Sequence, residues 1–202
     1  MSKLQKVLSI VFHPFLVPTY AILVFLNSVL GEFLLSTINP NAQWYIIGTI
    51  VLSTCILPFV INNGIRITNK RETKQNIKVL SLISLSIFTY LAYYLLKDIP
   101  MLTILSTYLL SEVCICVIAS IITAFWNISI YGMVWGGMIG FFYFLCLVSK
   151  ASYLCILLVS IIIGGMMGWN RLKTESHSAK ELYFGYAVGF AIALIVLILL
   201  SY

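Results

Sequence analysis

Three of the ionisable side chains in the stretch WNRLKTESHSAKE, residues 169–181, have a spacing compatible with catalysis, and the stretch lies between two long apolar runs. Arg171 is followed six residues later by His177 and, four residues further, by Glu181. Side chains four positions apart share a helix face, so Glu181 can accept a hydrogen bond from one imidazole nitrogen of His177. The other nitrogen can then attack an electrophile, and Arg171 can hold a negatively charged group. This spacing predicts nucleophilic chemistry on an anionic substrate.

The same stretch has a structural interpretation. Ser178 and Glu181 fit the S-x-x-E pattern of a capping box, in which the two side chains close the first turn of a helix. That pattern requires no substrate, and the spacing of Arg171, His177 and Glu181 is by itself a weak signal of catalysis. Both interpretations start a helix near Ser178, where backbone N–H groups also attract anions.

The elements that must position these residues are membrane-spanning helices. The 202 residues are 61% hydrophobic and only 9% charged, which excludes a soluble globular domain. The 5 cysteines fall inside apolar runs and, with only 2 histidines in the chain, predict neither a disulfide framework nor a metal site. We therefore expect one integral membrane domain over residues 1–202, with no metal and no cofactor.

Seven apolar runs approach or exceed the roughly 20 residues that cross a bilayer core. They cover residues 8–30, 44–63, 78–97, 99–125, 132–149, 152–170 and 182–200. The fold class predicted is all-α, a polytopic membrane helix bundle of about six to seven transmembrane helices. Of the 12 Lys and Arg residues, all except Lys97 and Lys150 fall on the side of the N-terminus, which the positive-inside rule places in the cytoplasm. Basic residues that bind phosphate would weaken this argument.

The first of two further loops on that side is GIRITNKRETKQNIK, residues 64–78. Its basic side chains Lys70, Arg71 and Lys74 can clamp phosphate oxygens. They can equally well be an ordinary flanking loop that attracts anionic lipid headgroups.

The second loop is FWNISIYGMVWGG, residues 125–137. Its simplest interpretation is a helix–helix turn in which Ser129 caps the next helix and Tyr131 is an interface aromatic. Because all three loops are predicted on one side, phosphate-binding and nucleophilic groups would converge at one membrane face.

The three loops resemble the three motifs of the type 2 phosphatidic acid phosphatase superfamily, a family of multi-span lipid phosphatases. The family pattern S-R-x5-H-x3-D is similar to N-R-x5-H-x3-E from Asn170 to Glu181. The pattern P-S-G-H is similar to I-S-I-Y from Ile128 to Tyr131, where tyrosine replaces histidine. The pattern K-x6-R-P is poorly matched, because residues 64–78 contain no Arg-Pro pair. The likeness covers residues 64–195, and YFGYAVGF and GGMIG resemble short bacterial members.

The resemblance implies a phosphohistidine mechanism in a bacterial inner membrane. His177 would attack phosphorus, Glu181 would orient it, and Tyr131 would have to protonate the leaving oxygen. The residues expected to hold the substrate are Arg171, Lys74, Arg71, Lys70, Ser129 and Asn170. The expected substrate is a phospholipid or an isoprenoid phosphate such as a polyprenyl diphosphate, and no nucleic acid is expected as a partner. A phenol is a poorer acid than an imidazolium near neutrality, and a good leaving group, such as the phosphate released from a pyrophosphate, would need less acid assistance.

Two other functions compete with this one. A relative that has lost catalysis could bind phosphorylated lipid or serve as a subunit of a membrane assembly, which the altered first and second motifs favour. The retained Arg171, His177 and Glu181 favour the enzyme. A transporter would have to use Glu112, an intramembrane carboxylate and hence a functional candidate, but no paired inverted halves support it. His13, in FHPFLVPTY, is interpreted as a structural residue at the headgroup level.

Overall fold

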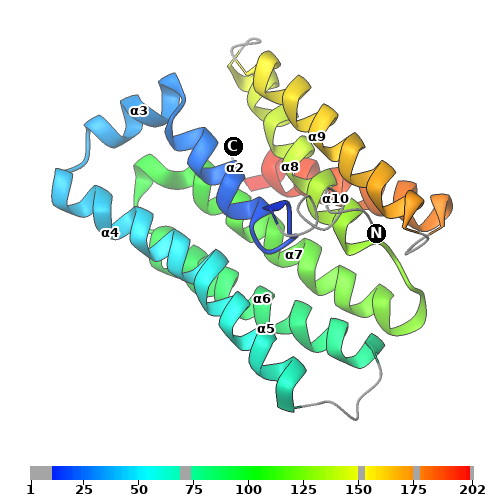
Figure 1. Ribbon diagram of the computed structural model, residues 1–202. Coiled ribbons are helices and arrows are strands. Elements are labelled where there is room, and N and C mark those ends of the chain that lie inside the picture. The colour runs from blue at the N-terminus through cyan, green and yellow to red at the C-terminus, as the bar shows by residue number, and fades with distance from the viewer. Residues whose placement is uncertain (1–10, 69–73, 150–152, 175–177, 201–202) are drawn as a thin grey trace.

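The computed structural model describes residues 11–68, 74–149, 153–174 and 178–200, and these form helices joined by turns (Figure 1). The elements in chain order are α2 (Val17–Leu26), α3 (Val29–Ser36), α4 (Pro40–Val51), the π-helical turn η1 (Leu52–Ile56), α5 (Leu57–Thr68), α6 (Lys74–Leu96), the 3₁₀ turn η2 (Pro100–Leu102), α7 (Thr103–Phe125), α8 (Ile130–Val148), α9 (Leu154–Lys173) and α10 (Ala179–Leu200). Within the described residues there is no strand.

The described helices confirm the polytopic membrane bundle. Six of them are long and apolar enough to cross a bilayer, and α4, η1 and α5 together make one of these, Pro40–Ile65. A seventh crossing is possible if the bent pair α2 and α3 counts as one span. The chain is thus a multi-pass membrane protein, in which the described helices pack against one another along part of their surface.

The first apolar run is not the single uninterrupted helix that residues 8–30 predict. Helix α2 begins only at Val17, after a non-helical turn, and the axis bends by 73° between α2 and α3. Pro18 lies in the first turn of α2, where a missing backbone N–H is tolerated. In the interior of a longer helix the same proline would remove a backbone hydrogen bond, so its position favours a helix that starts here. Ser28 begins α3 by accepting a hydrogen bond from the Gly31 N–H. Polar capping therefore interrupts a stretch that hydropathy alone joins.

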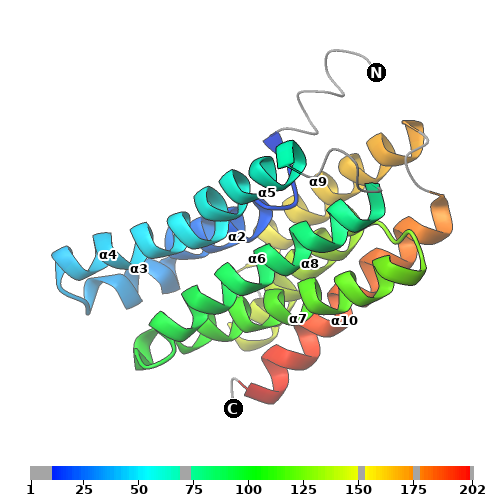
Figure 2. The same ribbon diagram turned by 90° about the horizontal axis from the view of Figure 1, so that it is seen from below.

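The helices run between two ends of the bundle (Figure 2). We call one of them the motif end: it carries the turn of residues 126–129 between α7 and α8, the last turn of α9 and the first turn of α10. The starts of α4 and α9 lie at the opposite end. Helix α2 connects the two, because His13 before it contacts Tyr131 at the motif end, while Ser28 after it hydrogen-bonds Tyr153 at the opposite end (Oγ to Oη 2.7 Å).

Glycines bring α8 and α10 into backbone contact. A Cβ on Gly132 would lie 2.8 Å from the Leu182 carbonyl oxygen, and one on Gly185 would lie 2.8 Å from the Ser129 carbonyl oxygen. Gly136 and Gly189 are closer still to the backbone of the facing helix. Small residues at four-residue spacing are the usual basis of close helix pairing in membranes. This pairing places the first turn of α8 beside the first turn of α10.

Candidate functional site

Arg171 and Tyr131 come together at the motif end, although they are 40 positions apart in the chain. Arg171 lies in the last turn of α9, and its guanidinium carbon is 3.5 Å from the centre of the Tyr131 ring in the first turn of α8. Guanidinium groups are attracted to aromatic faces, and the planar contact fixes the orientation of the cation. Both side chains are half-buried. The predicted phosphate clamp and the residue at the histidine position of the second motif thus form one unit.

Ser129 is the cap of helix α8, as the simpler interpretation of its loop predicted. Its Oγ accepts a hydrogen bond from the Gly132 N–H at 3.3 Å, and its backbone N–H donates to the Glu181 carbonyl oxygen at 3.4 Å. The residue is fully buried. Ser129 therefore joins the second motif segment to the third, and its hydroxyl faces protein rather than the bundle surface.

The capping box at the start of α10 is also confirmed. The Ser178 N–H donates to Glu181 Oε2, and the Glu181 N–H donates to Ser178 Oγ, each at 3.3 Å. A carboxylate has about four acceptor positions, so the cap is compatible with a second hydrogen bond to an imidazole. The predicted nucleophile, His177, lies outside the described residues.

The remaining predicted substrate ligands are placed in different ways. Lys70 and Arg71 lie outside the described residues, as does the side chain of Lys74, the first residue of α6. Asn170 is described and is fully buried on α9, one position before Arg171. Its side chain consequently faces the bundle interior rather than pointing outward.

Lys78 is a basic residue of the first loop that the sequence interpretation did not single out as a ligand. Its Nζ donates to Asn127 Oδ1 at 2.9 Å, in the turn that precedes Ser129. Nearby, Gln75 Nε2 donates to the carbonyl oxygens of Thr123 and Ala124 at 2.6 and 3.0 Å. These contacts fasten the start of α6 to the turn between α7 and α8. The first loop is therefore adjacent to the second in the structure.

His13 is a further residue that sequence reasoning did not assign to the site. Its ring centre is 6.1 Å from that of Tyr131, in an edge arrangement with an interplanar angle of 70°. Its Nδ1 accepts a hydrogen bond from the Phe15 N–H at 3.4 Å. In a neutral imidazole this leaves the proton on Nε2. The predicted membrane topology did hint at this contact, because it put the N-terminal segment at the same membrane face as the three motif loops.

Glu112 lies apart from this cluster. It is near the middle of α7 and only 1% exposed, and its carboxyl group interacts with the buried hydroxyl group of Tyr108 about one turn earlier on the same helix. A Cβ on Gly137 of α8 would come within 3.1 Å of Glu112 Oε1, so a glycine makes room for the carboxyl group. Gly137 is six residues beyond Tyr131, or about 9 Å along α8. Glu112 is consequently a separate buried group and not a member of the motif-end site.

Comparisons with protein-family models, curated proteins and solved structures found no match. The class that the described fold defines is a multi-pass α-helical membrane protein. The resemblance to lipid phosphatases therefore stays a prediction from the sequence, made from the residues of the three motifs and above all from Arg171, His177 and Glu181.

Proposed function

We propose that this protein is an integral membrane phosphatase-like enzyme that hydrolyses a lipid phosphate or a polyprenyl diphosphate. The observation that carries the proposal is the meeting of the second and third motif segments at one end of the bundle. Arg171 is stacked on Tyr131, and the backbone of Ser129 is bonded to that of Glu181. Residues from α8, α9 and α10 thus meet near the start of α10, which follows His177 in the sequence.

Phosphate binding follows from the charge at this end. The guanidinium of Arg171 offers a planar fork of donors to two phosphate oxygens, and its contact with Tyr131 holds that fork in place. Lys78 lies at the same end beside Asn127. Phosphoryl transfer is catalysed chiefly by positioning and by neutralising charge on the transferring group, so such an arrangement suits it.

The reaction has two steps. His177 attacks phosphorus, a phosphohistidine forms, and the bond from phosphorus to the leaving oxygen breaks; water then hydrolyses the phosphohistidine. Glu181 accepts a hydrogen bond from the second imidazole nitrogen, and Tyr131 protonates the leaving oxygen. His13, beside Tyr131, is suited to donate a hydrogen bond from Nε2 to a phosphate oxygen. A diphosphate substrate fits this set best, because its leaving group is a polyprenyl phosphate, whose oxygen departs with little acid assistance.

One observation favours a second function, lipid binding without turnover. The Tyr131 ring serves as the platform on which Arg171 is stacked, and that role requires no proton transfer. A protein with this arrangement would keep the phosphate clamp and lack an efficient acid. It would bind the same phosphorylated lipids, alone or as part of a membrane assembly.

We also propose that the protein lies in the bacterial inner membrane with the motif end in the cytoplasm. The uneven distribution of the 12 Lys and Arg residues supports this orientation.

The experiment that tests the function is phosphate release by the purified protein in detergent from phosphatidate, phosphatidylglycerophosphate and undecaprenyl diphosphate. We expect release that is lost in His177→Ala, lowered at least tenfold in Arg171→Ala and lowered less in His13→Ala. Release that persists in His177→Ala would overturn the phosphohistidine mechanism. No release from any substrate, together with Arg171-dependent binding of the same lipids, would establish the binding function instead.

A further inference from the structure

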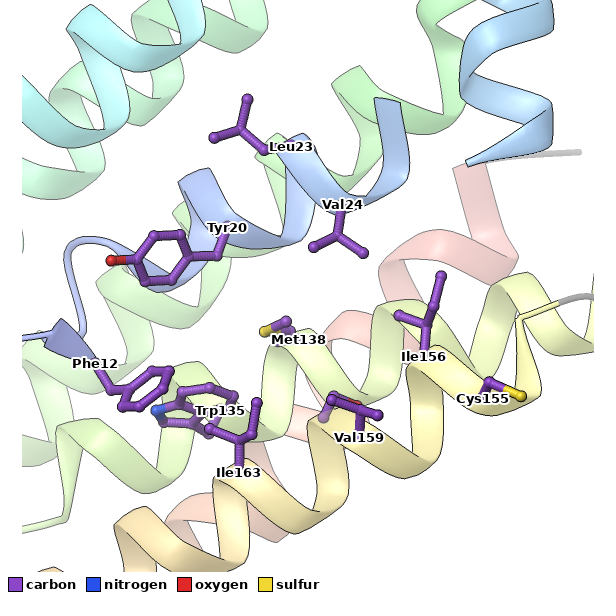
Figure 3. A pocket seen from close by; sticks show the side chains of 11 residues that line it. Phe12, Tyr20, Leu23, Val24, Trp135, Met138, Cys155, Ile156, Val159 and Ile163 are labelled. Atoms are coloured by element: carbon purple, nitrogen blue, oxygen red, sulfur yellow. The ribbon is translucent and has the colours of Figure 1, made fainter. Parts of the chain in front are cut away.

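A groove of about 440 Å³ separates α2 from the pair α8 and α9 (Figure 3). Its size is within the range of ligand sites, about 300–1,000 Å³. Most of its lining side chains are apolar, including Phe12, Val24, Met138, Ile156, Val159 and Ile163. Two hydroxyl groups among them are turned to backbone, because Tyr20 donates to the Val11 carbonyl oxygen at 2.9 Å and Ser160 to that of Leu157 at 2.7 Å. The groove therefore offers an apolar surface.

The groove begins next to the candidate site. On α8, Tyr131, Trp135 and Met138 follow one another at four- and three-residue spacing and so lie on one helix face. The ring of Tyr131 contacts the Arg171 guanidinium, and Trp135 and Met138 line the groove. The N-terminal segment repeats this junction: His13 contacts Tyr131, while Phe12 contacts Trp135 with ring centres 5.8 Å apart. Polar and apolar surfaces thus meet at consecutive residues.

The groove also has the direction that a lipid requires. Along α9 at about 1.5 Å per residue, Ile163 lies about 12 Å from Arg171 and Ile156 about 22 Å from it. The hydrocarbon core of a bilayer is about 30 Å thick. The apolar lining therefore extends from the cationic end of the bundle well into the depth that acyl or isoprenoid chains occupy.

We propose that this groove holds one hydrocarbon chain of the phosphorylated lipid whose phosphate binds at Arg171. The inference rests on the proposed function, since it assigns the chain of that same substrate. Surrounding lipid is as apolar as the groove, so moving a hydrocarbon chain into the groove gains little hydrophobic free energy. The groove contributes to binding mainly by fixing the position of the chain. A chain packed along α8 and α9 brings its headgroup out beside Arg171 and Tyr131, and phosphorylated compounds without a long chain lack this guidance.

The test compares equilibrium binding of dioleoyl phosphatidate and dihexanoyl phosphatidate to the purified full chain in detergent. Val159→Trp narrows the groove, and Ile162→Trp is its matched control, because Ile162 is on the same helix and exposed but is not part of the lining. We expect Val159→Trp to weaken binding of the long-chain lipid at least threefold and to leave the short-chain lipid unchanged. Ile162→Trp should change neither. Equal effects of the two variants on the long-chain lipid would overturn the inference.

Two further measurements separate this inference from the function on which it rests. If Arg171→Ala weakens both lipids while Val159→Trp has no selective effect, the phosphate site stands and the chain site is wrong. If Arg171→Ala changes neither lipid, the phosphate site fails and the chain assignment fails with it.

Photolabelling the unmodified protein with a phosphatidate that carries a diazirine in mid-chain needs no variant to fold. We expect label on residues 156–163 and Met138, and label confined to the outer faces of α6 and α10 would contradict the proposal.

Discussion

Tyr131 is the residue on which the proposed chemistry depends most. It stands where the resembling family has a histidine, and in the structure its ring supports the Arg171 guanidinium. In the proposed mechanism Tyr131 both supports Arg171, which would bind phosphate, and donates a proton, and each role constrains its position. In the proposed mechanism the nearby imidazole of His13 would assist Tyr131, and it belongs to the segment before α2 rather than to the turn before α8.

Replacing Tyr131 with histidine should restore acid assistance to the leaving group. General acid catalysis typically contributes a factor of about 10² to 10⁴. A monophosphate ester has a poor leaving group and needs that assistance more than a diphosphate does. We expect Tyr131→His to raise the rate on phosphatidate at least tenfold more than the rate on undecaprenyl diphosphate, measured as phosphate release under the same conditions.

Tyr131→Phe is the control, because it keeps the ring beneath Arg171 and removes only the hydroxyl group. It should lower the phosphatidate rate while leaving lipid binding intact. If Tyr131→His leaves the ratio of the two rates unchanged, Tyr131 is not at the acid position.

At the scale of the helices, the pairing of α8 with α10 decides whether the site exists. The two first turns meet because glycines let the backbones touch, and the bond from Ser129 N–H to the Glu181 carbonyl is a direct consequence. This part of the structure was partly predictable. The capping box of Ser178 and Glu181 was predicted, because its pattern lies within four consecutive residues.

A methyl group on α8 should have opposite effects from one on α9. A Cβ on Gly136 would collide with the Tyr186 carbonyl oxygen, whereas one on Gly165 would meet nothing within 4 Å. Overpacking costs about 1–3 kcal/mol, and alanine is favoured over glycine in a helix by about 1 kcal/mol. We expect Gly136→Ala to lower the thermal unfolding midpoint in detergent and Gly165→Ala to raise it slightly. A rise in both variants would show that α8 and α10 are not in backbone contact.

Contacts between distant segments were beyond the reach of the sequence. Arg171 and Tyr131 belong to different helices, and the face that each presents depends on how the bundle packs. The break in the helix before Val17 was not predicted for another reason. The residues of the turn that precedes α2 are mostly apolar, so hydropathy does not distinguish them from a helix. His13 reaches Tyr131 only through that turn. Periodicity and composition thus predict the helices, while side-chain convergence requires the packed structure.

At the scale of the whole molecule, the crossings fix which loops share a face. Helix α2 and the six long helices alternate between the two ends, so Lys97 after α6 lies at the opposite end from Lys180 in α10. In the orientation that we propose from the charge distribution, Lys180 and the motif end lie in the cytoplasm. The proposed enzyme would then take its lipid from the inner leaflet.

Labelling of introduced cysteines tests this orientation. Lys97→Cys and Lys180→Cys are matched, since both residues are exposed lysines, and each is made in a chain whose five native cysteines are replaced by alanine. In intact bacterial cells an impermeant maleimide should label the Lys97→Cys protein, and it should label the Lys180→Cys protein only after the membrane is permeabilised. The opposite pattern would mean that the basic residues at the motif end are there for phosphate binding rather than topology. The site would then face the outer leaflet, where it would meet lipids that have already crossed the membrane.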